Sequence, residues 1–135
     1  MEQAYQSKEY AELAEQVITE HEDLHWIREA GIGIGYLSSD KEKKSKGRVT
    51  FGECVKVKDL YKAYIPHDFV IVIYEPNTQE LTEEQLKILL YHELLHVDAV
   101  EVKGQLVCKT KQHDLFLEEF QAVADRYGTD WARTD

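Results

Sequence analysis

Apolar residues recur at helical spacing through the first thirty residues, among positions that are mostly polar or acidic. The apolar stripe consists of Leu13, Val17, Leu24 and Ile27. Such a stripe is typical of a helix that packs one face on a core. Gly31 favours a helix end, because glycine readily adopts the left-handed backbone that closes many helices. We therefore expect one long amphipathic helix from about Ala4 to Ala30. His21 and His25 lie four residues apart in it, and without a catalytic glutamate at the right place between them or a third ligand nearby we expect them on its surface.

Further along, apolar and polar residues alternate, which is the period of a β-strand. Ile32 to Tyr36 alternates in this way, and Arg48 to Val57 does so again. Between them, Ser38 to Gly47 is polar and rich in lysine, which predicts an exposed hairpin loop. Phe69 to Tyr74 is continuously apolar, as in a central strand. The pattern thus predicts a small, mostly antiparallel sheet.

A second helix is predicted from Thr82 onward. Thr82 and Gln85 have the spacing of a capping box, in which each side chain bonds the other residue's backbone N–H. Apolar residues then occupy most positions from Leu86 to Val100, which indicates a helix that is buried on most sides. We expect this helix to end near Glu101 to Gly104.

The second helix contains His92-Glu93-Leu94-Leu95-His96, an HExxH motif. Positions four apart share a helix face, so both imidazoles can reach one metal ion. Glu93 lies about 100° round the helix from His92, where its carboxylate can hold a metal-bound water and accept its proton. A Zn²⁺ ion also offsets the cost of burying an ionised glutamate among aliphatic groups. The competing interpretation is a pair of core histidines bonded to carbonyls, but the three residues together on a buried helix favour the zinc site.

A catalytic zinc site has three protein ligands and one position for water. His113 is the remaining histidine downstream, and it begins a second amphipathic stretch that runs to Tyr127, where Gly128 favours a helix end. We expect His113, at the head of this C-terminal helix, to complete the site, and Asp114 to cap the helix or orient a ligand histidine. The alternative third ligands are Glu118, Glu119 and Cys108.

These motifs resemble those of a family of phage and prophage metallopeptidases, itself similar to SprT-like zincins such as Spartan. The resemblance rests on His-Glu-Leu-Leu-His, then His113-Asp114, Glu118-Glu119-Phe120, Tyr127-Gly128 and Trp131. It implies that His92, His96 and His113 bind the metal and that Glu93 is the catalytic base. In the family pattern two fewer residues separate the third histidine from the glutamate pair. Two residues rotate a helix by about 200°, so His113 and the pair Glu118-Glu119 cannot both keep the family's orientation within one helix.

The composition is that of one small domain, since 135 residues with 43% hydrophobic content can bury a core without disulfides. We expect residues 1–135 to form a single zincin-like domain of the α+β class, with the motif helix followed by a C-terminal helix. No stretch is apolar for long enough to span a bilayer, and Met1-Glu2-Gln3 does not begin a signal peptide. Cys54 and Cys108 belong to no recognisable motif, which favours the reducing cytoplasm.

The resulting hypothesis is a zinc metallopeptidase that binds one Zn²⁺ ion and hydrolyses protein or peptide substrates. Tyr61, Tyr64 and His67 are candidates for stabilising the oxyanion, although ordinary loop and core positions explain them equally well. The alternatives are a non-catalytic zinc-binding interaction module and a metal-free acidic binding protein. The formal net charge of −10, with one short basic run from Lys41 to Arg48, argues against direct nucleic-acid binding and favours a basic protein substrate.

Overall fold

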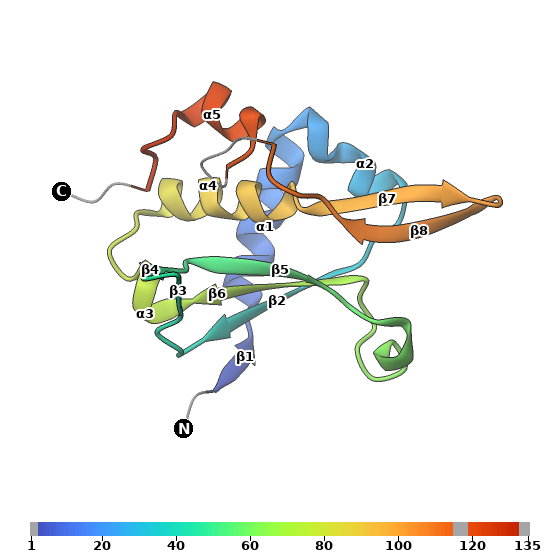
Figure 1. Ribbon diagram of the computed structural model, residues 1–135, viewed down its shortest axis with the longest axis horizontal. Helices are drawn as coiled ribbons and strands as arrows, with labels where there is room; N and C mark the ends of the chain where they lie inside the picture. The colour runs from blue at the N-terminus through green and yellow to red at the C-terminus, as the bar shows by residue number, and fades with distance from the viewer. Residues whose placement is uncertain (1–2, 115–118, 133–135) are drawn as a thin grey trace.

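The computed structural model describes residues 3–114 and 119–132, which form helices and strands in mixed order (Figure 1). The helices are α1 (Lys8–Glu20), α2 (His25–Glu29), α3 (Glu75–Thr78), α4 (Glu83–Leu94) and α5 (Gln121–Tyr127), with 3₁₀ turns at Glu22–Leu24 and Asp59–Tyr61. The strands are β1 (Ala4–Gln6), β2 (Ile34–Ser39), β3 (Lys44–Ser45), β4 (Arg48–Val49), β5 (Gly52–Lys56), β6 (Phe69–Tyr74), β7 (Val97–Val102) and β8 (Gln105–Thr110). This content confirms the predicted α+β class. Within the described ranges, no helix has the length and hydropathy needed to cross a membrane.

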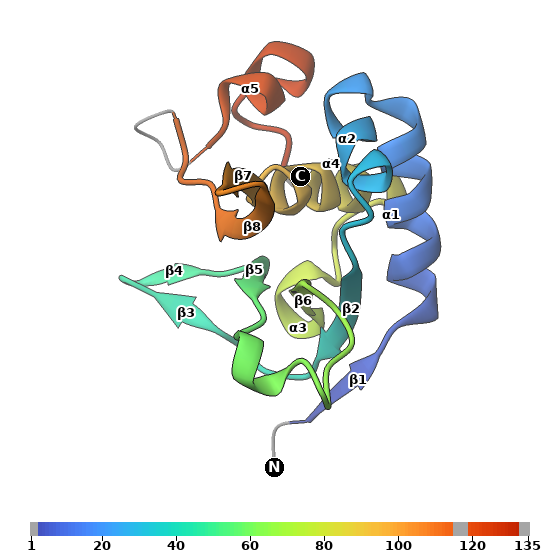
Figure 2. The ribbon, with the colours of Figure 1, turned by 90° about the vertical axis from the view of Figure 1, so that its right-hand side faces the viewer.

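The main sheet has the strand order β1-β2-β6-β5, with β6 inside and β5 at one edge. Strands β2 and β6 are parallel, while the other two pairs are antiparallel, as the alternating pattern predicted. Helices α1 and α4 cover one face of the sheet (Figure 2). On that face Phe69, Ile71 and Ile73 are fully buried, in one core with Val17 of α1 and Leu90 of α4. The continuously apolar stretch is therefore the central strand that the sequence predicted.

The N-terminal segment is not the single long helix that its periodicity indicated. Residues 4–6 form strand β1, and α1 begins after Ser7, whose hydroxyl accepts a hydrogen bond from the Tyr10 N–H. The α-helix ends at His21, where the backbone is extended (φ −122°, ψ 110°). The prediction of a surface position for His21 is wrong, because its ring is buried and its Nδ1–H donates to the Val17 carbonyl oxygen. Gly31 has φ +70°, as its predicted role at a helix end requires.

The motif helix begins as expected but ends earlier. Thr82 and Gln85 form the complete capping box, whereas α4 stops at Leu94 and the chain enters β7 instead of continuing to Glu101. The prediction failed because valines at i and i+3 fit a helix, yet β-branched residues also favour a strand. Lys103 and Gly104 both have positive φ (51° and 79°), which is the two-residue turn that closes a β-hairpin. Strands β7 and β8 consequently form a hairpin directly after the motif.

The C-terminal helix is also shorter than predicted. It begins at Gln121, so His113 lies in non-helical chain after β8 and does not head a helix. The β7–β8 hairpin brings this segment back to the motif, and the Lys111 N–H donates to the His96 carbonyl oxygen over 2.7 Å. A second hairpin, β3–β4, turns at Lys46 and Gly47 within the polar segment that was predicted as an exposed hairpin loop.

Candidate metal centre

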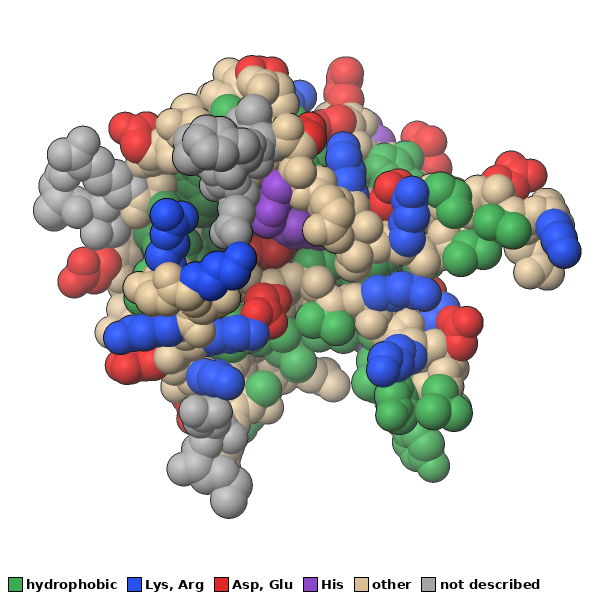
Figure 3. Space-filling model, viewed as in Figure 1, with side chains coloured by type: hydrophobic (Ala, Val, Ile, Leu, Met, Phe, Trp, Pro, Cys, Tyr) green, Lys and Arg blue, Asp and Glu red, His purple; other side chains and the backbone are tan. Residues whose placement is uncertain are grey.

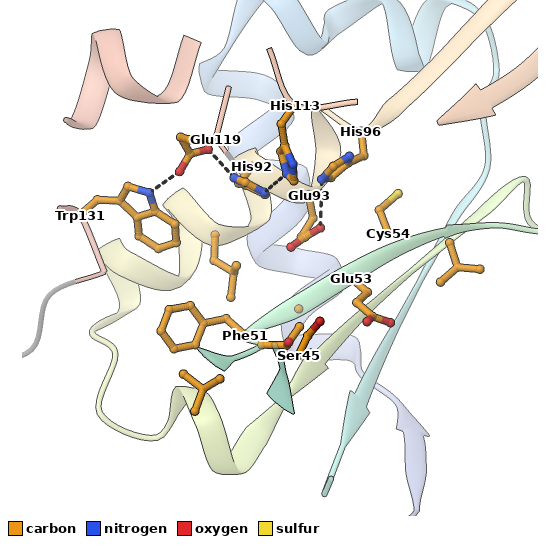
Figure 4. Close-up of a pocket in the computed structure, with 15 residues that line it drawn as sticks. Ser45, Phe51, Glu53, Cys54, His92, Glu93, His96, His113, Glu119 and Trp131 are labelled. Atoms are coloured by element: carbon orange, nitrogen blue, oxygen red, sulfur yellow. Dashed lines mark hydrogen bonds and ion pairs between the residues drawn. The ribbon is translucent and has the colours of Figure 1, made fainter. Parts of the chain in front are cut away.

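Three imidazoles from two separate segments meet at one point (Figure 4). His92 and His96 stand one turn apart near the end of α4, and His113 reaches them from the chain after the β7–β8 hairpin. One ring nitrogen from each histidine lies within 4.8 Å of the corresponding nitrogens of the other two. The Nε2 atoms of His92 and His113 are 3.1 Å apart. Two ligands at the usual Zn–N distance in tetrahedral geometry lie about 3.3 Å apart, so this spacing fits a zinc ion.

The outward-facing nitrogens of the two motif histidines are held by acceptors. Nδ1–H of His96 donates to the Lys111 carbonyl oxygen over 2.8 Å, and Nδ1–H of His92 donates to the Glu119 carboxylate. Because each acceptor fixes the proton on Nδ1, the lone pair of each Nε2 is turned toward the shared centre. The same backbone contact that closes the β7–β8 hairpin therefore also fixes the tautomer of a candidate ligand.

Glu119 lies behind His92 instead of among the candidate ligand atoms. Its carboxylate accepts hydrogen bonds from three donors, the His92 ring, the Phe120 backbone N–H and the Trp131 indole N–H, the last two over 2.9 Å. Burial alone raises the pKa of Glu119, but these donors outweigh it and hold the pKa below its usual range. Sequence reasoning treated Glu119 as a possible ligand, because residue spacing does not show which way a side chain points. Cys108, also considered as the third ligand, lies on β8 outside the histidine cluster, and Glu118 lies outside the described residues.

Glu93 is buried between α4 and the edge strand β5. Its side chain is 5% exposed, and one carboxylate oxygen lies 3.9 Å from Nε2 of His96. Burial raises the pKa of Glu93 to about 7, and the neighbouring His92 opposes this shift. A carboxyl group with this pKa is suited to exchanging a proton near neutral pH. The absence of a side chain at Gly52 leaves room for the Glu93 carboxylate, because a Cβ there would lie 3.4 Å from the Glu93 Oε2 atom.

Burial also favours the neutral form of a candidate ligand. Desolvation, supported by the neighbouring histidines, lowers the pKa of His96 to about 4 against the opposing hydrogen bond with the Lys111 carbonyl oxygen. Burial acts in the same direction on His92, but the Glu119 carboxylate outweighs it and raises the pKa of that ring. Uncharged imidazoles are the form that binds a metal ion. Three clustered histidines, two of them with outward hydrogen bonds, and a buried glutamate beside them are a donor set that fits zinc.

The histidines open onto a cleft of about 560 Å³. Helix α4 forms one wall together with His113, Glu119 and Trp131. The opposite wall is formed by Ser45, by residues 49–51 and by Gly52 to Val55 of β5. Tyr61, Tyr64 and His67 do not line this cleft; Tyr64 and His67 line a separate cavity beside β2. None of these three is therefore placed to stabilise an oxyanion at the histidine cluster.

Residues His21 to His25 repeat the HExxH pattern without forming a comparable site. The chain leaves the α-helix at His21, so the two rings do not share a helix face. Both His21 nitrogens are engaged, one with the Val17 carbonyl oxygen and the other with the Tyr127 hydroxyl over 2.8 Å. The His25 Nε2 atom instead contacts the Thr19 carbonyl oxygen. The only group of histidines, cysteines and acids found close enough to share an ion in the described part of the chain is the cluster beside α4.

A comparison with models of protein families matches residues 2–134 to the family described as "Putative phage metallopeptidase". The match covers nearly the whole chain, including both segments that carry the clustered histidines. No curated protein and no solved structure matches the chain.

Proposed function

The chain belongs to this family of phage metallopeptidases, and from that premise we propose that it hydrolyses peptide bonds with one zinc ion bound by His92, His96 and His113. The observation that carries the proposal is the convergence of three histidine nitrogens beside the buried carboxylate of Glu93. A purely structural zinc site needs four protein ligands and has no use for a proton acceptor next to it. Three ligands and a buried glutamate instead correspond to a catalytic arrangement.

The roles of the protein side chains follow from their surroundings. Zinc held by three imidazoles would supply a polarised water with a pKa near neutrality. Beside such a water, Glu93 would serve as the proton acceptor during attack on the substrate carbonyl, and its carboxyl group would return the proton to the leaving amine. Its raised pKa fits both duties, because the group must gain and lose a proton in each turnover. Glu119 keeps the His92 ring oriented throughout.

The edge strand β5 supplies a place for the substrate backbone. Within the described ranges its ladder partner is β6, and its residues Gly52 to Val55 line the cleft opposite the histidines. An extended peptide can add to such an edge through main-chain hydrogen bonds, which are independent of its side chains. Pairing there would carry the scissile bond past Glu93, on the wall formed by α4.

We further infer a single zincin-like domain over residues 1–135, related to SprT-like peptidases. One continuous core supports this inference, since buried residues of α1, α4, α5 and the main sheet belong to the same cluster. The edge strand beside the motif helix is the arrangement that a zincin uses.

The test is cleavage of a proteome-derived peptide library by the zinc-loaded protein, with cleavage sites identified by mass spectrometry. Wild type should cleave, and Glu93→Gln should bind zinc but cleave about 10²–10⁴ times more slowly. The control is Glu84→Gln, which changes an exposed glutamate on the same helix and should match wild type in both respects. Undiminished cleavage by Glu93→Gln would remove Glu93 from the mechanism. Zinc binding without any cleavage would instead identify a non-catalytic zinc module.

A further inference from the structure

Opposite charges are separated along the chain and in space. Residues 41–62 contain eight lysines and arginines against three acidic residues, whereas residues 1–29 contain eight acidic residues against two basic ones. The first of these segments includes the β3–β4 hairpin, and the second includes α1 and α2. Figure 2 places this hairpin and these helices on opposite sides of the molecule. The net charge of −10 therefore does not describe the side on which the cleft opens.

Several basic residues lie in the segments that form the walls of the cleft, although none of them is among its lining residues. Ser45 and Val49 of the β3–β4 hairpin line it, and Lys44, Lys46 and Arg48 alternate with them along the same hairpin. Beyond the hairpin, Lys56 follows the cleft-lining residues of β5, and the Lys111 ammonium lies 5.6 Å above the ring of Phe120, next to the histidines. Figure 3 shows lysine and arginine side chains on both sides of the exposed histidines. We call Lys44, Lys46, Arg48, Lys56 and Lys111 the basic rim.

Of the three glutamates that line the cleft, Glu53 and Glu119 are held by hydrogen bonds and Glu93 is buried beside His96, whereas the basic rim forms no ion pair with the described residues. Glu53 forms an ion pair with Lys43 and accepts a hydrogen bond from the Tyr74 hydroxyl, and Glu119 is held by its three donors. No member of the basic rim forms an ion pair with another residue in the part of the chain that the structure describes, and all five are exposed. Exposed cations around a concave site concentrate anionic ligands there, even when the whole protein is anionic.

We propose that the cleft selects an acidic segment of its substrate, with carboxylates on either side of the scissile bond contacting the basic rim. This substrate class rests on the proposed function, and it replaces the basic substrate that the net charge favoured. Apolar surface accompanies the charge, because Val49 and Val55 line the cleft while remaining 49% and 48% exposed. The preferred segment therefore combines acidic residues with a central apolar residue, a combination that a peptide offers and a nucleic acid does not.

Binding can be measured separately from catalysis, with zinc-loaded Glu93→Gln protein and fluorescent peptides read by anisotropy. Three peptides share length and an apolar centre, and their flanks are acidic, neutral or basic. The acidic peptide should bind about ten times more tightly than the neutral one, with the basic peptide weakest. Raising the salt concentration should reduce the difference, since exposed ion pairs are screened. Equal binding of the three, tighter binding of the basic peptide, or binding of a DNA duplex but not of the acidic peptide would overturn the proposal.

Charge reversal on the hairpin localises the effect. Lys44→Glu with Arg48→Glu removes two exposed cations, each worth about a factor of three, and adds two anions, so affinity for the acidic peptide should fall more than tenfold. Lys8→Glu with Lys103→Glu makes the same change in net charge at exposed positions on α1 and at the β7–β8 turn, away from the β3–β4 hairpin, and should have little effect. Retained zinc shows that each variant is folded. Lys44→Gln with Arg48→Gln removes the two cations without adding anions, and this milder change should lower the affinity about tenfold. Equal losses in the hairpin and control variants would refute a role for the rim. Acidic binding without cleavage by wild type would reject the proposed function while leaving this site in place.

Discussion

Replacing Glu119 by glutamine tests how the candidate metal site is held in shape. The carboxylate accepts from the His92 ring and the Phe120 N–H at one oxygen, and from the Trp131 indole at the other. Glutamine has nearly the same shape but only one acceptor oxygen. In either amide orientation its NH₂ group faces at least one of these donors. Glu119→Gln therefore removes the negative charge behind His92 and leaves at least one buried N–H without an acceptor.

The two consequences have different sizes and different readouts. A buried donor without a partner costs about 1–3 kcal/mol, which should appear as a lower free energy of unfolding of the metal-free protein. Loss of the carboxylate that orients a ligand histidine weakens metal binding about 10- to 100-fold, or about 1.4–2.7 kcal/mol. Zinc affinity is measured by competition with a chromophoric chelator, and stability by urea denaturation in EDTA. Glu84→Gln, on the exposed side of α4, is the matched control. It should leave zinc affinity unchanged and lower the free energy of unfolding by less than about 1 kcal/mol, the contribution of a carboxylate in the first helical turn.

A double variant separates the two effects. Trp131→Phe removes the indole donor, so the amide of Glu119→Gln can turn its oxygen toward His92 without opposing another N–H. The stability losses of Glu119→Gln and Trp131→Phe should therefore be less than additive, while zinc binding by the double variant stays weak. Zinc affinity of Glu119→Gln within about twofold of wild type would refute the orienting role of this carboxylate.

Two further substitutions test the surroundings of the site. Gly52→Ala places a Cβ 3.0 Å from a backbone oxygen of β6 and 3.4 Å from a Glu93 carboxylate oxygen. We expect the free energy of unfolding, measured by urea denaturation, to fall by about 1–3 kcal/mol, and the peptide library to be cleaved more slowly although zinc is retained. Unchanged cleavage would show that Glu93 tolerates the displacement. Partial burial alone raises the pKa of Asp68, but hydrogen bonds from the Gly33 N–H and Lys62 outweigh it, so the pKa is lowered. Asp68→Asn should cost about 1 kcal/mol at pH 7. Its difference from wild type should begin to shrink as the pH falls below about 4, where the carboxylate of the unfolded chain is protonated, and should be lost below the lowered pKa of the folded state. A difference that does not shrink in acid would argue against this electrostatic origin.

Local patterns in the sequence were sufficient to predict where the motif helix begins and which segment forms the central strand. Thr82 and Gln85 act within one turn, so their capping box needs no tertiary contact to be recognised. The continuously apolar stretch from Phe69 to Tyr74 likewise favours burial over any exposed position. The same kind of reasoning predicted that His113 lies near the motif histidines. It expected His113 at the head of a helix, whereas the chain returns to the motif through the β7–β8 hairpin.

Features that depend on side-chain direction could not be predicted in this way. The HExxH pattern occurs twice, and the copy at His21 fails because its ring bonds the end of its own helix and the distant Tyr127. Spacing also placed Glu119 among possible ligands, whereas its three donors come from separate parts of the chain. Sequence reasoning set the pair at His21 and His25 aside for lack of a suitably placed glutamate or a third ligand, although Glu22 occupies the motif position.

The central claim is a three-histidine zinc site, and the most direct test is the metal content of untagged protein purified without chelators, measured by elemental analysis. Wild type should contain about one zinc per chain. His113→Ala should lose most of it, while His25→Ala, which removes a histidine outside the cluster, should keep it. Protein that contains no metal and gains no stability when zinc is added would contradict the site. Full zinc retention by His113→Ala would show that His113 is not the third ligand.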